Sequence, residues 1–417
     1  MAHRTTDIVI AGGGVIGMAI AYFLSKETEQ TITVIDQKKP GNASWASAGG
    51  LWPIGESVGL GCGVIFFKSL SKRRRENPNT AIDNSRPHQL PDCFLSYSLI
   101  SNNMFPALWK ELKEEANVDF KFEHTGLKFL MYDEDDIAYA KQIQQGIPHL
   151  TEQLRWHSQQ QLHQEEPYIS KEAIGALTFL PDHQLNPYLL VQAFRDGARK
   201  NGVNIIENSE ITDVIQHNHR VTGVKTQKQQ INCSLLINAA GAWAGQIGEM
   251  IGINIPVAPV KGQVIVSERL PPIMRACIST SDCYIAQKDN GEILIGSTTE
   301  IKGFETHCSY PELRALVAGA IKALPMLKDV AIKRTWAGLR PGSPDELPIL
   351  GPIPGIDGYL NACGHFRTGI VSSPITARII TDLVLGTPPP IDISPFLYER
   401  FLNPDFKATF ALTENVA

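Results

Sequence analysis

Residues 7–36 read DIVIAGGGVIGMAIAYFLSKETEQTITVID, and the rest of the chain can be organised around this stretch. A short apolar run ends in the pattern G-x-G-x-x-G, whose glycines are Gly12, Gly14 and Gly17. In a strand, turn and helix of this kind, the first glycine permits the tight turn and the second lets the backbone approach a pyrophosphate. The third allows the helix to pack closely on the strand, and the anion lies at the helix N-terminus. The stretch therefore predicts a dinucleotide site.

The residues that follow the glycines support the same prediction. Ile16, Ile20 and Leu24 fall at helical spacing, which gives the helix one apolar face to lay on a sheet. A second strand then ends at Asp36, nineteen positions after Gly17, where an acid is placed to accept from a ribose hydroxyl. An acid rather than a basic residue argues against a 2′-phosphate, and so against NADP. A glycine-rich turn without a ligand is the alternative, and it explains neither the helix nor the acid.

Length and composition limit the class of protein. The 417 residues indicate about two or three domains, and 43% hydrophobic with 19% charged residues is typical of a globular protein. A net charge of −5 and a pI near 6.1 give no global electrostatic reason to expect a nucleic acid partner. The run Lys72–Arg75 is basic; we interpret it as a solvated loop, with a contact to anionic lipid or a partner as the alternative.

Targeting and cysteine patterns are also informative. The first strand begins within seven residues, which leaves no room for a signal segment, and no apolar run reaches the roughly 20 residues that span a bilayer. We therefore expect a cytoplasmic protein, at most peripheral on the inner face of the cell membrane. The seven cysteines are scattered without a C-x-x-C pair, so we expect no iron–sulfur centre, structural zinc or other metal site within this chain.

Beyond residue 36, the patterns indicate two kinds of sheet. A helix bounded by Asn186-Pro187 and Asn201-Gly202, then an apolar strand at 235–238, return the chain to the first sheet. Short strands are expected at 120–122 and 126–131, and alternating strands joined by a hairpin turn at 288–291 indicate an antiparallel sheet. The predicted fold class combines α/β and α+β: a discontinuous Rossmann-like dinucleotide-binding domain, and a substrate-binding domain on a mixed antiparallel sheet. The expected boundaries are residues 1–90, 155–250 and 335–417 for the first domain, and 91–154 and 251–334 for the second.

Three further segments carry candidate chemistry. Residues 41–56 are small and hydroxyl-rich, so their backbone amides can face a flat ring. Residues 335–342 read TWAGLRPG, and residues 361–370 read NACGHFRTGI before a predicted helix at 372–385. The N-terminus of that helix presents unpaired N–H groups, which would favour the negative charge that develops on a flavin pyrimidine ring. A helix entry without a ligand is the alternative.

The glycine unit, the run Ala337–Pro341 and the run Gly364–Ile370 together resemble the glycine oxidase and D-amino acid dehydrogenase family of FAD-dependent amine oxidoreductases. The resemblance covers nearly the whole chain. Within that family, residues 46–52, 55–63, 289–300 and 361–367 are most similar to the cyanide-forming glycine dehydrogenases, which are catalytic subunits of hetero-oligomers. No single residue in these runs has a chemistry that demands glycine.

The resemblance implies FAD, held without a covalent bond, and a set of site residues. The cofactor-binding residues it implies are Gly12, Gly14, Val15, Ile16, Gly17, Asp36, Ser44, Ser47, Ala48, Gly49, Gly50, Leu51, Val214, Ala240, Gly241, Trp243, Gly364, His365, Phe366, Arg367, Thr368, Gly369 and Ile370. It makes Arg340 the clamp for a substrate carboxylate, Tyr284 a second contact, and Arg367 a catalytic-site residue near the flavin. A guanidinium binds a carboxylate bidentately, which fits this role. A structural ion pair for Arg340 and a half-buried strand position for Tyr284 are the alternatives.

The resemblance also implies a reaction and partners. Glycine would be oxidised to an imine and then, with loss of carbon dioxide, to hydrogen cyanide. Electrons would leave through partner subunits that carry an iron–sulfur centre and further cofactors, in a complex peripheral to the membrane. The rival functions are oxidation of D-amino acids, opines or hydroxyproline, a non-catalytic flavoprotein subunit, and a nicotinamide enzyme. Arg340 and the complete glycine turn at 364–369 argue against a non-catalytic subunit.

Overall fold

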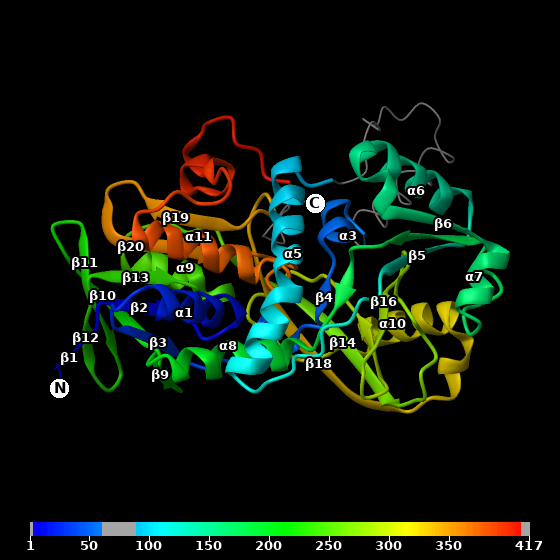
Figure 1. Cartoon of the computed structure of the whole chain (residues 1–417), viewed down its shortest axis with the longest axis horizontal. Coiled ribbons are helices and arrows are strands. Elements are labelled where there is room, and N and C mark those ends of the chain that lie inside the picture. The colour runs from blue at the N-terminus through cyan, green and yellow to red at the C-terminus, as the bar shows by residue number, and fades with distance from the viewer. Residues whose placement is uncertain (1–2, 61–88, 410–417) are drawn as a thin grey trace.

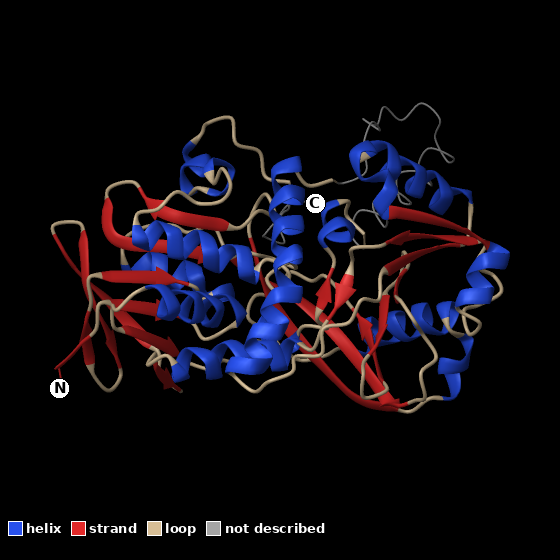
Figure 2. Cartoon of the chain, viewed as in Figure 1, coloured by secondary structure: helices blue, strands red, loops and turns tan. Residues whose placement is uncertain are grey.

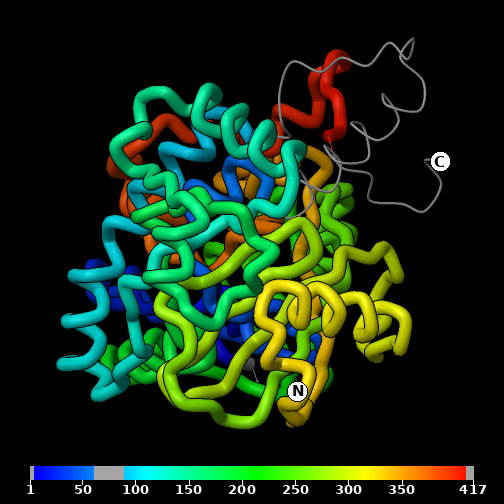
Figure 3. Tube along the Cα trace, turned by 90° about the vertical axis from the view of Figure 1, so that its right-hand side faces the viewer, coloured from blue at the N-terminus to red at the C-terminus, as the bar shows by residue number. Residues whose placement is uncertain are grey.

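The computed structural model describes residues 3–60 and 89–409, which form two large sheets with helices packed around them (Figures 1 and 2). The first sheet and its helices occupy the left half of Figure 1, and the second sheet occupies the right half. Figure 3 views the molecule from the side of the second sheet. The basic run Lys72–Arg75 lies outside the described residues.

The first sheet has ten strands and a parallel centre. Across the centre, the strands are β20 (Ile356–Cys363), β13 (Leu235–Asn238), β2 (Ile8–Ala11), β3 (Ile32–Asp36) and β9 (Asn204–Glu207). The remaining strands are β1 (His3–Thr5), β12 (Gln230–Asn232), β11 (Arg220–Thr226), β10 (Ile211–His217) and β19 (Ile349–Ile353). In register, Ile10 of β2 lies opposite Val34 of β3 and Ile237 of β13. The glycine motif therefore begins at the carboxyl edge of a parallel sheet, where open α/β sheets bind their ligands.

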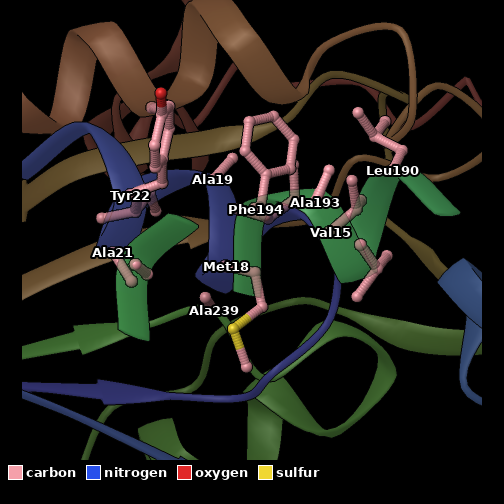
Figure 4. Close-up of a cluster of buried hydrophobic side chains, with 14 of the residues drawn as sticks. Val15, Met18, Ala19, Ala21, Tyr22, Leu190, Ala193, Phe194 and Ala239 are labelled. Atoms are coloured by element: carbon pink, nitrogen blue, oxygen red, sulfur yellow. The ribbon is translucent and has the colours of Figure 1, made fainter. Parts of the chain in front are cut away.

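Strand β2 is buried on both faces, which explains its continuous apolar sequence. Ile8 and Ile10 pack against α1 (Val15–Glu27), α8 (Pro187–Lys200) and α11 (Ser373–Leu385). Figure 4 shows the side chains of α1 and α8 meeting in this cluster, with Tyr22 beside Phe194. Val9 and Ala11 face the other side, towards β10, β11 and α9 (Ala244–Met250).

The helix predicted between residues 186 and 201 is confirmed as α8. Its N-cap is Asn186, whose side chain accepts a hydrogen bond from the backbone N–H of Leu189 at 3.2 Å, and Pro187 is the first helical residue. Asn186 thereby satisfies one of the unpaired N–H groups of the first turn, and Pro187 has no N–H to satisfy. Local chemistry alone was sufficient to fix this boundary.

The second sheet has eight strands and is antiparallel except where β15 pairs with β5. Its order is β18 (Ile332–Gly342), β14 (Ala258–Arg269), β17 (Glu292–Gly296), β16 (Tyr284–Gln287), β15 (Cys277–Ser279), β5 (Leu127–Met131), β7 (Gly175–Phe179) and β6 (Leu154–Ser158). The predicted mixed antiparallel sheet is confirmed. The hairpin turn predicted at 288–291 joins the antiparallel pair β16 and β17.

Shorter elements complete the described chain. The other helices are α2 (Ala43–Ala46), α3 (Pro53–Ser57), α5 (Asp92–Glu115), α6 (Glu134–Gly146), α7 (Gln159–Glu165) and α10 (Tyr310–Ala323). A small third sheet pairs β4 (Gly50–Leu51) with β8 (His183–Gln184). The 3₁₀ helices are η1 (Pro148–Gln153), η2 (Gly241–Trp243), η3 (Pro325–Asp329), η4 (Ser394–Phe396) and η5 (Tyr398–Leu402). Among the helices described, none is long and apolar enough to cross a membrane.

The sheets place several segments differently from the sequence analysis. Residues 155–179, expected in the dinucleotide-binding domain, contribute most of β6 and all of β7 to the second sheet, and β18 crosses the expected boundary at residue 335. Helix α5 packs on α8 and α11, although residues 91–154 were assigned to the substrate-binding domain. Residues 120–122 form no strand. Strand partners are chosen by pairing between distant segments, which local patterns do not encode. We propose domain boundaries that follow the two sheets.

Candidate active site

A cavity of about 500 Å³ is lined by residues of both large sheets. One side comes from the loop after β2, the end of β3 and the segment after β13, and the other from β16, β17 and β18. The predicted site residues that line it are Gly12, Gly14, Val15, Ile16, Asp36, Ser44, Ser47, Ala48, Gly50, Ala240, Gly241, Trp243, Tyr284, Arg340, His365, Phe366, Arg367, Gly369 and Ile370. Residues from nearly the whole length of the chain therefore meet at one cavity.

Close backbone contacts explain the glycines of the motif. Gly12 has φ +104°, and a Cβ there would lie 2.4 Å from the carbonyl oxygen of Ala239. A Cβ on Gly17 would lie 1.9 Å from the carbonyl oxygen of Gly12, so only glycine lets α1 pack this closely on the turn. Gly14 is the N-cap of α1 and makes no side-chain cap hydrogen bond. The N-terminus of α1 is thus shaped to receive an anion.

Asp36 and Ser44 lie beside this turn. Asp36 ends β3 and lines the cavity, and burial raises the pKa of its carboxyl group. Ser44 accepts a hydrogen bond from the backbone N–H of Val15 at 2.9 Å through its hydroxyl group, which brings the 42–47 segment against α1. Asn42 caps α2 by accepting from the N–H of Ser44 at 2.9 Å. The glycine cradle and the helix end offer backbone N–H donors, and Asp36 offers an acceptor for a ribose hydroxyl. These are the groups that the dinucleotide part of FAD requires, so the residues present fit this cofactor.

Six predicted cofactor residues do not line the cavity: Gly17, Gly49, Leu51, Val214, Gly364 and Thr368. Gly17 and Gly49 instead allow close packing, because a Cβ on Gly49 would lie 2.1 Å from the carbonyl oxygen of Leu185. Leu51 and Val214 are core side chains. Thr368 donates its hydroxyl proton to the carbonyl of His365 at 2.8 Å and so braces the turn. The contacts of Gly17, Gly49 and Thr368 support the loops that line the cavity. Cofactor contacts at these six residues, including one through the backbone of Val214, stay predictions.

Arg340 lies on β18, opposite Val260 of β14. Its Nη1 donates to the carbonyl of Thr298 at 3.0 Å, and its Nη2 donates to the hydroxyl group of Ser297. The guanidinium crosses Gly262, where a Cβ would lie 2.3 Å from Nη1. Glycine at residue 262 is therefore needed for the arginine to reach the cavity in this conformation.

Tyr284 begins β16 and lines the same cavity as Arg340. Burial raises the pKa of its hydroxyl group, so the group stays protonated and can donate a hydrogen bond at neutral pH. Trp52 also lines the cavity, and its ring meets the ring of Tyr284 edge to face with centroids 5.2 Å apart. Tyr284 is therefore a half-buried strand residue and also lines the cavity, so the two interpretations of this residue do not exclude each other.

Arg367 lies between two carboxylates. Its Nε donates to Oε2 of Glu56 at 2.9 Å, and its Nη2 donates to Oε2 of Glu346 at 2.8 Å. The side chains of Arg367, Glu56 and Glu346 are only 12%, 15% and 2% exposed. Arg367 and Glu56 line the cavity. The sequence analysis named Arg367 alone, and the structure adds the two acids that pair with it.

His365 is fully buried in the turn before α11, although it also lines the cavity. One ring nitrogen, Nε2, is 2.9 Å from the hydroxyl group of Thr376, which in turn is 2.6 Å from the hydroxyl group of Tyr97. Burial lowers the pKa of His365 to about 3, so the ring is neutral at physiological pH. A neutral ring can connect the turn to α5 and α11 without adding charge.

Sequence reasoning missed Trp52, Glu56, Gly262 and Glu346 as site residues. Trp52 and Glu56 lie inside the small-residue segment at 41–56, yet their partners Tyr284 and Arg367 come from distant strands and turns. The local signals in the sequence were the glycine motif and the segments 41–56, 335–342 and 361–370, and none of them singled out these four residues. Gly262 carries none, because its role depends on the side chain of the facing strand.

Comparison with known proteins agrees with this geometry. Residues 7–383 match the family model described as FAD dependent oxidoreductase. The chain is 56% identical to hydrogen cyanide synthase subunit HcnC of Pseudomonas protegens, over 95% of this chain and 96% of that protein. It is 29% identical to glycine oxidase of Pseudomonas putida, over 94% and 98% of the two chains. The crystal structure of glycine oxidase from Geobacillus kaustophilus superposes with a TM-score of 0.82 at 26% identity, covering 94% of this chain and 98% of that one. The chain therefore belongs to the family of FAD dependent oxidoreductases, and FAD is its cofactor.

Proposed function

We propose that this chain is the catalytic, glycine-oxidising subunit of a hydrogen cyanide synthase. The observation that carries the proposal is that Arg340 and Tyr284 face the same cavity as the glycine cradle. Identities of 56% and 54% to two HcnC subunits, each over at least 95% of this chain, support the choice of glycine within the family.

The side chains at the substrate end suit an amino acid. Arg340 offers two N–H groups on one plane to the substrate carboxylate, and the hydroxyl group of Tyr284 adds a donor. Two points of attachment fix the α-carbon, which converts the encounter into a reaction of an oriented pair. The hydrogen bonds from Arg340 to Ser297 and Thr298 hold the guanidinium in place before the substrate arrives.

The reaction needs two oxidations of one bound molecule. Bound FAD supplies the hydride acceptor for such chemistry. In the first oxidation, glycine loses a hydride from its α-carbon and a proton from its nitrogen, which gives the imine. In the second, the imine carboxylate loses carbon dioxide, a further hydride and a further proton, which gives hydrogen cyanide. The imine must stay away from water between the two, because hydrolysis would release glyoxylate and ammonia. Trp52 and Tyr284 pack against each other at the cavity, and we assign to this apolar contact the role of limiting water at this end.

The name of the HcnC relatives describes a subunit, so we also propose partner chains for this one. The resemblance supports partners that carry an iron–sulfur centre and further cofactors, and a complex peripheral to the cell membrane. Such partners would accept the two electron pairs released per glycine.

A turnover assay tests the function. The purified chain, alone and with its partners, would be given glycine and an artificial electron acceptor, and cyanide, carbon dioxide and glyoxylate would be measured. We expect cyanide and carbon dioxide in equal amounts from the assembled complex. Glyoxylate without cyanide, or faster turnover of D-proline or an opine, would contradict the cyanide assignment and leave the flavin chemistry intact. Glycine-dependent formation of hydrogen peroxide would instead support a glycine oxidase.

A further inference from the structure

Glu56 and Arg340 line the same cavity, and the reaction described above gives Glu56 no part. Both side chains line the cavity, as does Tyr284, whose hydroxyl group feels the charge of each. A cation and a carboxylate therefore both line the cavity beside Tyr284. A bound amino acid is a zwitterion, so it brings one group that matches each of them.

Glu56 shares its counterion with a second acid. The guanidinium of Arg367 donates to both Glu56 and Glu346, so one cation serves two carboxylates. The bond to Arg367 engages one oxygen of Glu56, Oε2, and an ionised carboxylate has a second oxygen that also accepts. Burial strengthens the interaction of such a group with a ligand charge.

The backbone that carries Glu56 is fixed in place. Asp182, which is fully buried, accepts hydrogen bonds from the N–H groups of Ile54 and Gly55 at 3.1 and 2.8 Å. A Cβ on Gly55 would lie 2.8 Å from both Oδ2 of Asp182 and a methyl carbon of Leu127. Helix α3 is therefore clamped at its first turn, and Glu56 is presented from a rigid support, as a binding residue requires.

We propose that Glu56 is the binding site for the substrate nitrogen, where its carboxylate acts as counterion to the ammonium group and to the protonated imine that follows. This inference rests on the proposed function only in taking an α-amino acid as the substrate. With the carboxylate on Arg340 and the nitrogen on Glu56, the molecule is held at both ends, and the charged imine is retained for the second oxidation.

The test compares a ligand that has the nitrogen with ligands that lack it. For the FAD-loaded full chain, the KM of glycine and the inhibition constants of acetate and glycolate would be measured. Glu56→Gln keeps the size of the side chain and removes the charge. We expect the ratio of the acetate inhibition constant to the glycine KM to fall at least about tenfold, because a charged partner of a desolvated cation is lost. Glu56→Asp, which keeps the charge, should restore part of the preference.

Glu346→Gln is the matched control. It removes the same charge and also one hydrogen bond of Arg367, but Glu346 does not line the cavity. We expect its ratio to stay within about twofold of the wild type. An unchanged ratio in Glu56→Gln, or an equal fall in Glu346→Gln, would overturn the proposal and make Glu56 a structural partner of Arg367.

Two further outcomes are decisive. If Glu56→Gln fails to bind FAD, the wild-type protein still decides, because glycolate that binds as tightly as glycine would overturn the proposal. If the wild type oxidises another amino acid and not glycine, the proposed function fails. The comparison is then made with that amino acid and its carboxylic acid analogue without the amine, so the two failures are distinguishable.

Discussion

The two ends of the cavity are built in different ways. At the dinucleotide end, the cavity is lined mainly by backbone groups from one continuous stretch. These are Gly12, Gly14 and the first turn of α1, with Asp36 at the end of the next strand. At the substrate end, side chains from four distant segments meet, among them Glu56, Tyr284, Arg340 and Arg367. The dinucleotide end can form only because its glycines have no side chains. The substrate end depends on how its charged side chains are placed relative to each other. We therefore expect changes at the first end to affect folding and cofactor binding, and changes at the second to affect catalysis.

The largest effect is expected at Gly17. The Cβ in Gly17→Ala would lie 1.9 Å from a backbone oxygen that cannot move without shifting the strand. The cost should be about 4 kcal/mol or more, with loss of the visible flavin absorbance. Gly245→Ala is the control, since its Cβ would meet nothing closer than 3.3 Å. If the Gly17→Ala protein folds fully and keeps its bound flavin, the dinucleotide end does not depend on the absence of a side chain at this position.

Arg340→Lys should leave FAD binding intact and impair catalysis. A lysine is a point charge and cannot give two parallel hydrogen bonds to a carboxylate. The loss should be about 2–4 kcal/mol, or roughly one to three decades in kcat/KM with a raised KM. Arg334→Lys on the same strand is the control, because Arg334 is exposed and lies over Trp336. Unchanged steady-state kinetics for Arg340→Lys would place the substrate carboxylate elsewhere.

The charge state of His365 should make the stability of the protein depend on pH. Burial lowers its pKa from 6.5 in the unfolded chain to about 3 in the folded protein. Below pH 6.5 the histidine becomes protonated in the unfolded state while it stays neutral in the folded state, which favours unfolding. The free energy of unfolding is therefore unaffected by His365 above pH 6.5 and falls progressively between pH 6.5 and about pH 3. At pH 5 the loss is about 2 kcal/mol relative to neutral pH. Urea unfolding of the holoenzyme at several pH values should show a weaker acid dependence in His365→Gln; equal slopes in both proteins would contradict the pKa shift.

The smallest effect concerns the substrate. If the substrate end is built for glycine, D-alanine should react at least about tenfold more slowly, because a methyl group forced into a packed pocket typically costs about 1–3 kcal/mol. The kcat/KM values of the two substrates, measured with one artificial acceptor, check this directly. Equal values would contradict a pocket built for glycine and would show that the substrate end also accepts a larger amino acid.

The fold was predictable to the extent that it rests on local chemistry. The glycine motif, the capped start of α8 and the hairpin between β16 and β17 each follow from residues that are adjacent in sequence. The assignment of β6 and β7 to the second sheet was not predictable, because β7 pairs antiparallel with the distant strand β5, and β6, among the described strands, joins the sheet only through β7. Strands of five residues carry no local mark of the sheet they join.

The amino-acid sequence determined the dinucleotide end, because a tight turn, a close helix and an acid at the end of a strand are properties of one short stretch of backbone. The tertiary structure decided the substrate end. Glu56 and Arg367 are 311 residues apart, and Gly262 matters only because the guanidinium of Arg340 crosses it from the next strand. Ion pairs and side-chain contacts between residues far apart in sequence form only after the segments that carry them have packed together.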